Sequence, residues 1–245
     1  MKIKLLSALF FSLFILNAVN AQKKEKIKYQ ADELRYLREN KEPVRKLINN
    51  VIFKQGTLTI TCDSANFYNK RNTMEAYGNI KITDIDSLII TGNKLIYDGN
   101  KKIAKLRENV IYTKNNYELR TNFLDYNIEN KIGKFFDYGL LKENENNLRS
   151  KDGTFYAQDK YSIFYNDVEF EGPEYILFTD SLKYNSRNEV IETYGSTKIV
   201  TQDSIYVNSL GGNFETKKKS SLLKMSTIET SNYTLEANEI NLDNN

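Results

Sequence analysis

The segment TCDSANFYN, residues 61–69, holds the residue types of a nucleophilic centre, because the only cysteine of the chain, Cys62, is followed by Asp63 and Ser64. A cysteine nucleophile needs a base or another cause of a lowered thiol pKa. The chain contains no histidine, so neither a Ser-His nor a Cys-His pair can form. We therefore predict that Cys62 is a small, buried strand residue, replaceable by Ser or Thr.

Paired carboxylates are the other chemistry that the residue types allow. Asp84 and Asp86 lie two residues apart, and Asp63 and Asp180 occupy related places in the chain. A glycosidase needs two carboxyl groups at a fixed separation in one cleft, and none of these spacings is diagnostic. Aspartates at turns usually accept hydrogen bonds from backbone amides instead. We expect no enzyme here, with no catalytic residue, no metal and no cofactor.

The first 21 residues have the pattern of a secretory signal peptide. Lys2 and Lys4 precede an apolar run of about a dozen residues, which is short of the roughly 20 that span a bilayer, and cleavage after Ala21 is predicted. The chain has 35 Lys and Arg against 32 Asp and Glu, and loss of the two N-terminal lysines brings the net charge close to zero. Near-neutral charge and export both argue against a nucleic-acid partner.

The remaining chain repeats with a period of about 29 residues. Two sets of residues recur at this spacing. Aromatic residues close six units at Tyr68, Tyr97, Tyr126, Tyr156, Tyr184 and Phe214, and the units open at Asn50, Asn79, Asn109, Tyr138, Asp167 and Ser196. An incomplete seventh unit follows, and a degenerate one precedes the array. A β unit of this size cannot bury its apolar face alone, so neighbouring units must stack.

Apolar residues alternate with other residues inside each unit, which predicts strands. We expect an all-β, elongated β-jellyroll of about seven repeats, in which two antiparallel sheets face each other across an apolar interior. Residues 22–30 are expected to be a short exposed lead-in, and residues 31–245 a single domain. The alternation leaves open whether the two sheets pack as a closed sandwich or stand apart as an open trough. The predicted interior positions are Val51, Phe53, Leu58, Ile60, Ile80, Ile82, Leu88, Ile90, Leu95, Tyr97, Val110, Tyr112, Leu119, Val168 and Phe170.

The recurrent strand opening resembles that of a known family. Gly78-Asn79-Ile80 begins one unit, Asn49-Asn50-Val51 and Glu108-Asn109-Val110 begin others without the glycine, and segments such as CDSA and TDSLKY run toward a closing aromatic. Together with the signal peptide, this pattern resembles the OstA/LptA family over nearly the whole mature chain. The resemblance implies a periplasmic β-jellyroll that carries the acyl chains of lipopolysaccharide.

The resemblance also implies partners. These are lipopolysaccharide through its lipid A, an inner-membrane LptC-like protein and an outer-membrane LptD-like protein, with membrane association only through such partners. Open sheet edges at both ends of the array favour head-to-tail pairing, with other copies or with related domains. Two other hypotheses share the repeat. One is an exported structural or adhesive array that binds protein or glycan on its outer face, and the other is an aromatic platform for single-stranded nucleic acid, which the charge disfavours.

Overall fold

The computed structural model describes residues 25–39, 41–202, 205–216 and 220–243, so the predicted signal peptide lies outside the described residues. The described part of the chain forms seventeen β-strands and no helix long and apolar enough to cross a membrane. The strands are β1 (Lys28–Gln30), β2 (Glu33–Glu39), β3 (Glu42–Gln55), β4 (Leu58–Tyr68), β5 (Thr73–Asp84), β6 (Leu88–Asp98), β7 (Ile103–Lys114), β8 (Tyr117–Asn127), β9 (Ile132–Glu143), β10 (Asn146–Ser150), β11 (Asp152–Tyr156), β12 (Tyr161–Glu171), β13 (Tyr175–Asn185), β14 (Val190–Thr201), β15 (Tyr206–Glu215), β16 (Ser220–Glu229) and β17 (Thr234–Asp243).

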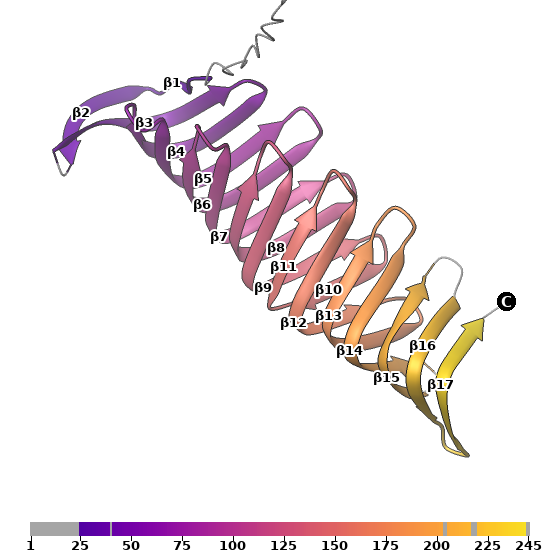
Figure 1. The fold of residues 1–245 in the computed structure, drawn as a ribbon. Coiled ribbons are helices and arrows are strands. Elements are labelled where there is room, and N and C mark those ends of the chain that lie inside the picture. Colours follow the sequence, from indigo (N-terminus) through magenta and orange to yellow (C-terminus); the bar gives the residue numbers. More distant parts are fainter. Residues whose placement is uncertain (1–24, 40, 203–204, 217–219, 244–245) are drawn as a thin grey trace, which may run out of the picture.

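All seventeen strands belong to one antiparallel sheet, in which strands pair with their neighbours along the chain except at two places. At these two places in the sheet, two short strands take the position of one long strand. β1 and β2 pair with different halves of β3, and β10 and β11 together occupy one place between β9 and β12. Figure 1 shows the result as a long stack of bent strands running from β2 to β17. The predicted all-β fold is confirmed.

Each long strand bends near its middle, so the sheet folds lengthwise into two facing walls. The first wall contains, among others, residues 51–55, 58–61 and 80–84. The second wall contains residues 64–68, 73–77 and 94–98. We call the line of bends the corner, and the two rows of hairpin turns at the far edges of the walls the lips. The two facing layers predicted from the sequence are therefore halves of the same strands, in one continuous sheet (Figure 1).

Pairs of residues in the left-handed backbone conformation produce the bends of alternate strands. Asn49 and Asn50 have φ values of 60° and 48°, and the pairing of β3 with β4 shifts register at this point. Such β-bulges bend a strand and increase its twist. Asn, Asp and Gly tolerate positive φ better than other residues. The equivalent pairs are Gly78 and Asn79, Glu108 and Asn109, Asp137 and Tyr138, and Asn166 and Asp167.

The openings of the sequence repeats are these same residues. Five of the six predicted opening positions are the second member of a left-handed pair, and the sixth, Ser196, follows Gly195 with φ 82°. The sequence repeat therefore has the same period as the left-handed residue pairs along the corner. One opening recurs for every two strands, because the chain crosses the corner twice in each unit.

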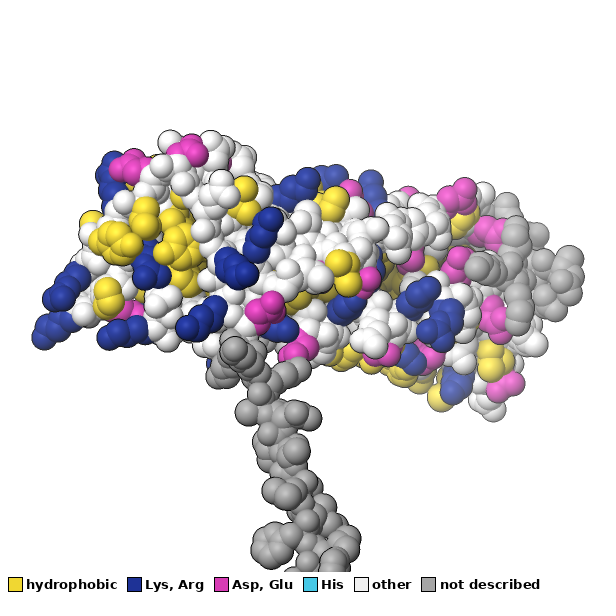
Figure 2. All heavy atoms as spheres, turned by 90° about the horizontal axis from the view of Figure 1, so that it is seen from above, with side chains coloured by type: hydrophobic (Ala, Val, Ile, Leu, Met, Phe, Trp, Pro, Cys, Tyr) yellow, Lys and Arg dark blue, Asp and Glu magenta, His cyan; other side chains and the backbone are white. Residues whose placement is uncertain are grey.

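Both ends of the stack present sheet edges that the described strands leave unpaired. β2 pairs only with β3, and β17 only with β16. Every residue of β2 is exposed, including Leu34, Tyr36 and Leu37. Figure 2 shows hydrophobic side chains among Lys and Arg toward this end of the molecule. The N-terminal edge is thus an exposed strand of apolar and charged residues, without a described neighbour on one side.

The start of the sheet differs from the prediction. Residues 22–30 are predicted as an exposed lead-in, but Ile27 is buried in the core and Lys28–Gln30 form β1. Tyr29 packs its ring 5.2 Å from that of Phe67, on the opposite wall. The lead-in therefore contributes to the closure of the interior at the N-terminal end.

Candidate functional site

The space between the two walls is the candidate functional site. All fifteen predicted interior residues lie there, on the inner faces of both walls, and none is more than 4% exposed. They belong to one continuous hydrophobic cluster that reaches from Ile27 to Ile240. Outward-facing neighbours such as Lys81 and Ile89 are exposed. The alternation read from the sequence thus assigns the faces of the strands correctly.

A row of large and small side chains lines the second wall near its lip. In cross-strand register, aromatic residues on every second strand are separated by small or aliphatic ones such as Ala104, Gly133 and Ser162. A Cβ added at Gly133 would lie 2.1 Å from the ring of Phe155, so the glycine is needed to admit the ring. The aromatic members of the row are Phe67, Tyr97, Tyr126, Phe155, Tyr184 and Phe214.

Two of the closing aromatics predicted from the sequence are not members of this row. Tyr68 and Tyr156 face outward, and Phe67 and Phe155 before them face the interior. The Tyr68 hydroxyl donates to carboxylates of Glu39 and Glu75, each at 3.2 Å. Two adjacent aromatic residues occur at both places, and successive strand residues face opposite sides. A spacing that varies between 28 and 30 residues could not choose between them.

Ring contacts join the two walls through the interior. Phe53 of the first wall lies 6.0 Å from Phe67 of the second, and Tyr112 of the first wall lies 4.6 Å from Phe155 of the second, measured between ring centroids. Side chains therefore fill the interior between these residues. Of the two arrangements left open by the sequence, the closed one describes this part of the molecule.

Hydrogen bonds close the interior at the lips. The buried Tyr97 hydroxyl donates to Gln55 Oε1 at 2.6 Å, and Gln55 Nε2 donates to the Gly99 carbonyl at 2.9 Å. Further along, the Tyr117 hydroxyl and Ser162 Oγ lie 3.3 Å apart. Because these groups come from opposite walls, opening the interior at the lips requires that these bonds break.

A cavity of about 700 Å³ lies between the walls toward the C-terminal end. Its volume is within the usual range for a small-molecule site. Polar residues also line it, among them Glu145, Gln202 and Thr216. Its apolar lining residues are Phe170, Pro173, Tyr175, Ile199, Ile205, Val207, Phe214, Ile228 and Tyr233.

The sequence identified only part of this cavity. Phe170 is in the predicted interior set and Phe214 is a predicted closing aromatic, whereas Ile199, Val207 and Ile228 were not singled out. The same alternation continues through IVTQDSIYVN, and that signal could have found Ile199 and Val207. What it could not show is that a cavity remains between the walls here, since that depends on how the side chains of both walls pack.

Cys62 is buried in the interior cluster, as predicted. Burial, and then the neighbouring Asp63 carboxylate, raise the pKa of its thiol to about 12. The thiol is therefore protonated at any physiological pH, and a thiol in this state is a poor nucleophile.

The aspartates considered for catalysis have structural partners. Asp84 Oδ1 accepts a hydrogen bond from Thr57 Oγ1 at 2.6 Å and another from the amide of Ile85 at 2.8 Å. Asp86 pairs with Lys131, whose ammonium group lowers the pKa of that carboxyl. The described residues bring no group of three or more Asp, Glu or Cys side chains into a metal-binding arrangement.

A single antiparallel sheet, folded lengthwise at regular bulges around an apolar interior, defines the class of β protein to which the chain belongs. Residues 23–180 match the family model described as OstA-like protein, which is more than half of the chain. The chain therefore belongs to the OstA-like family, and the resemblance to the OstA/LptA family is confirmed.

Comparison with individual proteins adds little to this assignment. A search of the curated proteins finds no match. Among solved structures, the chain is similar to LptH from Pseudomonas aeruginosa, described as the LptA homologous periplasmic component of the conserved lipopolysaccharide transport device. The identity is 7%, the TM-score is 0.41, and the match covers 44% of this chain and 81% of LptH.

Proposed function

We propose that this chain is a periplasmic lipopolysaccharide-transport protein, which holds lipid A acyl chains between its two walls. The observation that carries the proposal is the continuous apolar interior, with a cavity of about 700 Å³ at one end that this interior partly lines. Each acyl CH₂ group kept out of water contributes about 0.8 kcal/mol, so a lipid that leaves a membrane needs an apolar interior of this kind. Family membership supports the same function.

The cavity would be the first place that an acyl chain occupies. The middle of the interior is filled by side chains of the protein, so a lipid that passes there must displace rings such as Tyr112 and Phe155 or separate the lips. The cavity lining needs no such rearrangement. We propose that lipid enters or leaves at the C-terminal end, and that passage along the interior opens the hydrogen bonds at the lips one unit at a time.

The two sheet edges support a role in a bridge between membranes. An unpaired strand edge is a template for pairing with another strand, and β2 and β17 present such edges at opposite ends of the stack. We propose head-to-tail pairing with further copies or with LptC-like and LptD-like proteins, which would join their apolar interiors end to end. Residues 1–21 would be removed on export, and the remaining chain would act as one domain.

Site-specific photo-cross-linking in cells tests lipid binding. A photoreactive residue replacing Val207, which lines the cavity, is expected to give lipopolysaccharide adducts. The matched control is the adjacent Tyr206, which is 52% exposed on the outer face. Equal adducts from both positions, or none from Val207, Ile90 and Leu119, would contradict the proposal.

The same method tests the assembly. Photoreactive residues at Tyr36 in β2 and at Thr234 in β17 are expected to trap end-to-end products. Lys81, on the outer face far from both edges, serves as the control. Products that form only from Lys81 would show association side by side, and the head-to-tail proposal would fail.

A further inference from the structure

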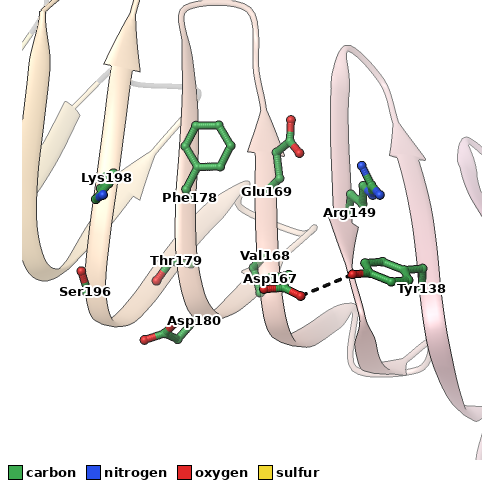
Figure 3. A pocket seen from close by; sticks show the side chains of 10 residues that line it. All are labelled: Tyr138, Arg149, Asp167, Val168, Glu169, Phe178, Thr179, Asp180, Ser196 and Lys198. Atoms are coloured by element: carbon green, nitrogen blue, oxygen red, sulfur yellow. Dashed lines mark hydrogen bonds between the residues drawn. The ribbon is translucent and has the colours of Figure 1, made fainter.

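A groove with an accessible volume of about 440 Å³ lies on the outer face of the first wall, next to the corner. Strands β9, β10, β12, β13 and β14 contribute its lining (Figure 3). Register shifts occur at this level between β12 and β13 and between β13 and β14. The groove therefore originates where bulges locally distort the surface of the sheet, on the side opposite the apolar interior.

An aromatic ring flanked by opposite charges forms the middle of the groove. Phe178 is 43% exposed. Its cross-strand neighbours on the same face are Glu169 on one side and Lys198 on the other, as Figure 3 shows. Across the described residues, neither charged side chain makes an ion pair or a side-chain hydrogen bond with the protein. The ring and both charges are thus available to a ligand.

A preorganised edge borders this row. The guanidinium carbon of Arg149 lies 5.2 Å from the centroid of the Tyr138 ring, and the Tyr138 hydroxyl donates to Asp167 at 3.4 Å. Arg149 is also the direct cross-strand neighbour of Glu169. A cation held over a ring loses less freedom when it binds a ligand, because its side chain is already oriented.

We propose that this groove binds a saccharide chain. A pyranose ring has an apolar face of C–H groups, which can stack on the exposed Phe178 ring, and a rim of hydroxyls that both donate and accept hydrogen bonds. Glu169 and Asp180 would accept hydrogen bonds from its hydroxyls, while Lys198 and Arg149 would donate to hydroxyl or ring oxygens. A few fixed polar groups around an apolar surface are typical of specific ligand sites.

The charges favour a neutral or weakly charged sugar over other ligands. The lining contains Arg149 and Lys198 against Asp167, Glu169 and Asp180. An anion such as a phosphate would meet the carboxylates, and a cation would meet the two basic groups. A sugar hydroxyl satisfies both kinds of group, since it can act as donor and as acceptor.

The mature protein can be titrated with oligosaccharides and followed by saturation-transfer difference NMR. The ligands are chitohexaose, maltohexaose and the delipidated saccharide released from lipopolysaccharide by mild acid. At least one is expected to bind, with saturation transfer from aromatic protons of the protein. Phe178→Ala is expected to weaken binding at least tenfold, and Lys198→Gln several-fold.

Ile176→Ala is the matched control. Ile176 lies on the same face of the same strand, two residues from Phe178, and does not line the groove. This variant is expected to bind the saccharide within twofold of wild type. Circular dichroism should show that all three variants fold, and cross-linking of lipid from Val207 should be unchanged, which separates this proposal from the transport function.

Two outcomes would overturn the saccharide site. One is the absence of binding by every oligosaccharide of the panel. The other is binding that Phe178→Ala leaves unchanged, which would place the saccharide elsewhere on the protein.

Discussion

Asn79 Nδ2 donates a hydrogen bond of 2.9 Å to Asp63 Oδ2, and this bond joins two neighbouring strands where both cross the corner. The same pairing recurs at two other bends, as Asn50 with Asp32 at 2.7 Å and Asn166 with Asp152 at 2.9 Å. Asparagine at these places does two things, because it tolerates positive φ and its amide reaches the carboxylate opposite. The aspartate beside Cys62 therefore stabilises a bend.

Gly78→Ala should destabilise the protein, by about 1–3 kcal/mol. Gly78 has φ 75°, and a Cβ there would lie 2.3 Å from Asp63 Oδ2. A side chain in the left-handed region costs roughly 1–2 kcal/mol, and the contact would also displace the acceptor of Asn79. The free energy of unfolding from urea titration measures the effect.

Gly92→Ala is the control for this substitution. Gly92 lies at the bend of the next strand, its φ is not positive, and the nearest atoms to a new Cβ are 3.6 Å away. Gly92→Ala is expected to change the free energy of unfolding of the protein much less than Gly78→Ala does. If the two variants were equally destabilised, loss of backbone flexibility rather than the corner geometry would explain both.

The sequence predicted the parts of the fold that depend on local pattern. Alternation placed residues such as Ile82 and Leu119 on the inner face, because a strand has a fixed period of two. The 29-residue spacing of Asn50 and Asn79 marked the corner, since left-handed bulges need particular residue types there. Both patterns depend only on residues close together in the sequence, so contacts between distant residues do not change them.

What the sequence did not predict depends on contacts between distant residues. Gln55 accepts a hydrogen bond from the Tyr97 hydroxyl of the opposite wall, 42 residues along the chain. No local sequence pattern in either segment indicates this contact. The cavity near Val207 likewise depends on how side chains from both walls pack against one another. The outer groove at Phe178 is lined by residues of five strands, and the alternating pattern of each strand alone marks its outward residues only as solvent-exposed.

Tyr97→Phe should cost about 1–3 kcal/mol of stability. The hydroxyl is buried and donates to Gln55 Oε1 at 2.6 Å, and its loss would leave a buried acceptor without this partner. Tyr77→Phe is the control, because the exposed Tyr77 hydroxyl donates to Glu75 at 3.2 Å on the outer face. Urea denaturation should show a clear loss only for Tyr97→Phe. Equal midpoints for both variants would mean that the lip bond contributes no stability.

Cys62→Ser should leave lipid cross-linking from Val207 intact. Cys62 is 6% exposed, and burial raises the pKa of its thiol to about 12, so the thiol stays neutral and is a poor nucleophile. In the native wild type at pH 8, Cys62 should react slowly with a disulfide reagent, and urea should make it react fast. Rapid reaction in the native state would contradict the burial of Cys62. Loss of lipid adducts from a folded Cys62→Ser protein would show that Cys62 has a functional role.

Glu143→Gln should stabilise the protein at neutral pH. Glu143 is 8% exposed at the lip of the first wall, near Tyr184, Glu189 and Lys160. Burial is the main cause that raises the pKa of its carboxyl above the ordinary value. The folded state therefore binds the proton more tightly than the unfolded state. The stability from this group is fully present below the unfolded pKa and is lost as the pH rises through the folded pKa.

The amide of the variant does not titrate, so the difference between variant and wild type must depend on pH. The melting temperature of Glu143→Gln should exceed that of the wild type at pH 7.5, and the gap should close by pH 4, where both states of the wild type become protonated. Glu171→Gln, which removes an exposed carboxylate from the outer face, controls for the change in net charge. A gap that stays constant from pH 4 to pH 7.5 would show that packing at the lip, and not the ionisation of Glu143, determines the effect.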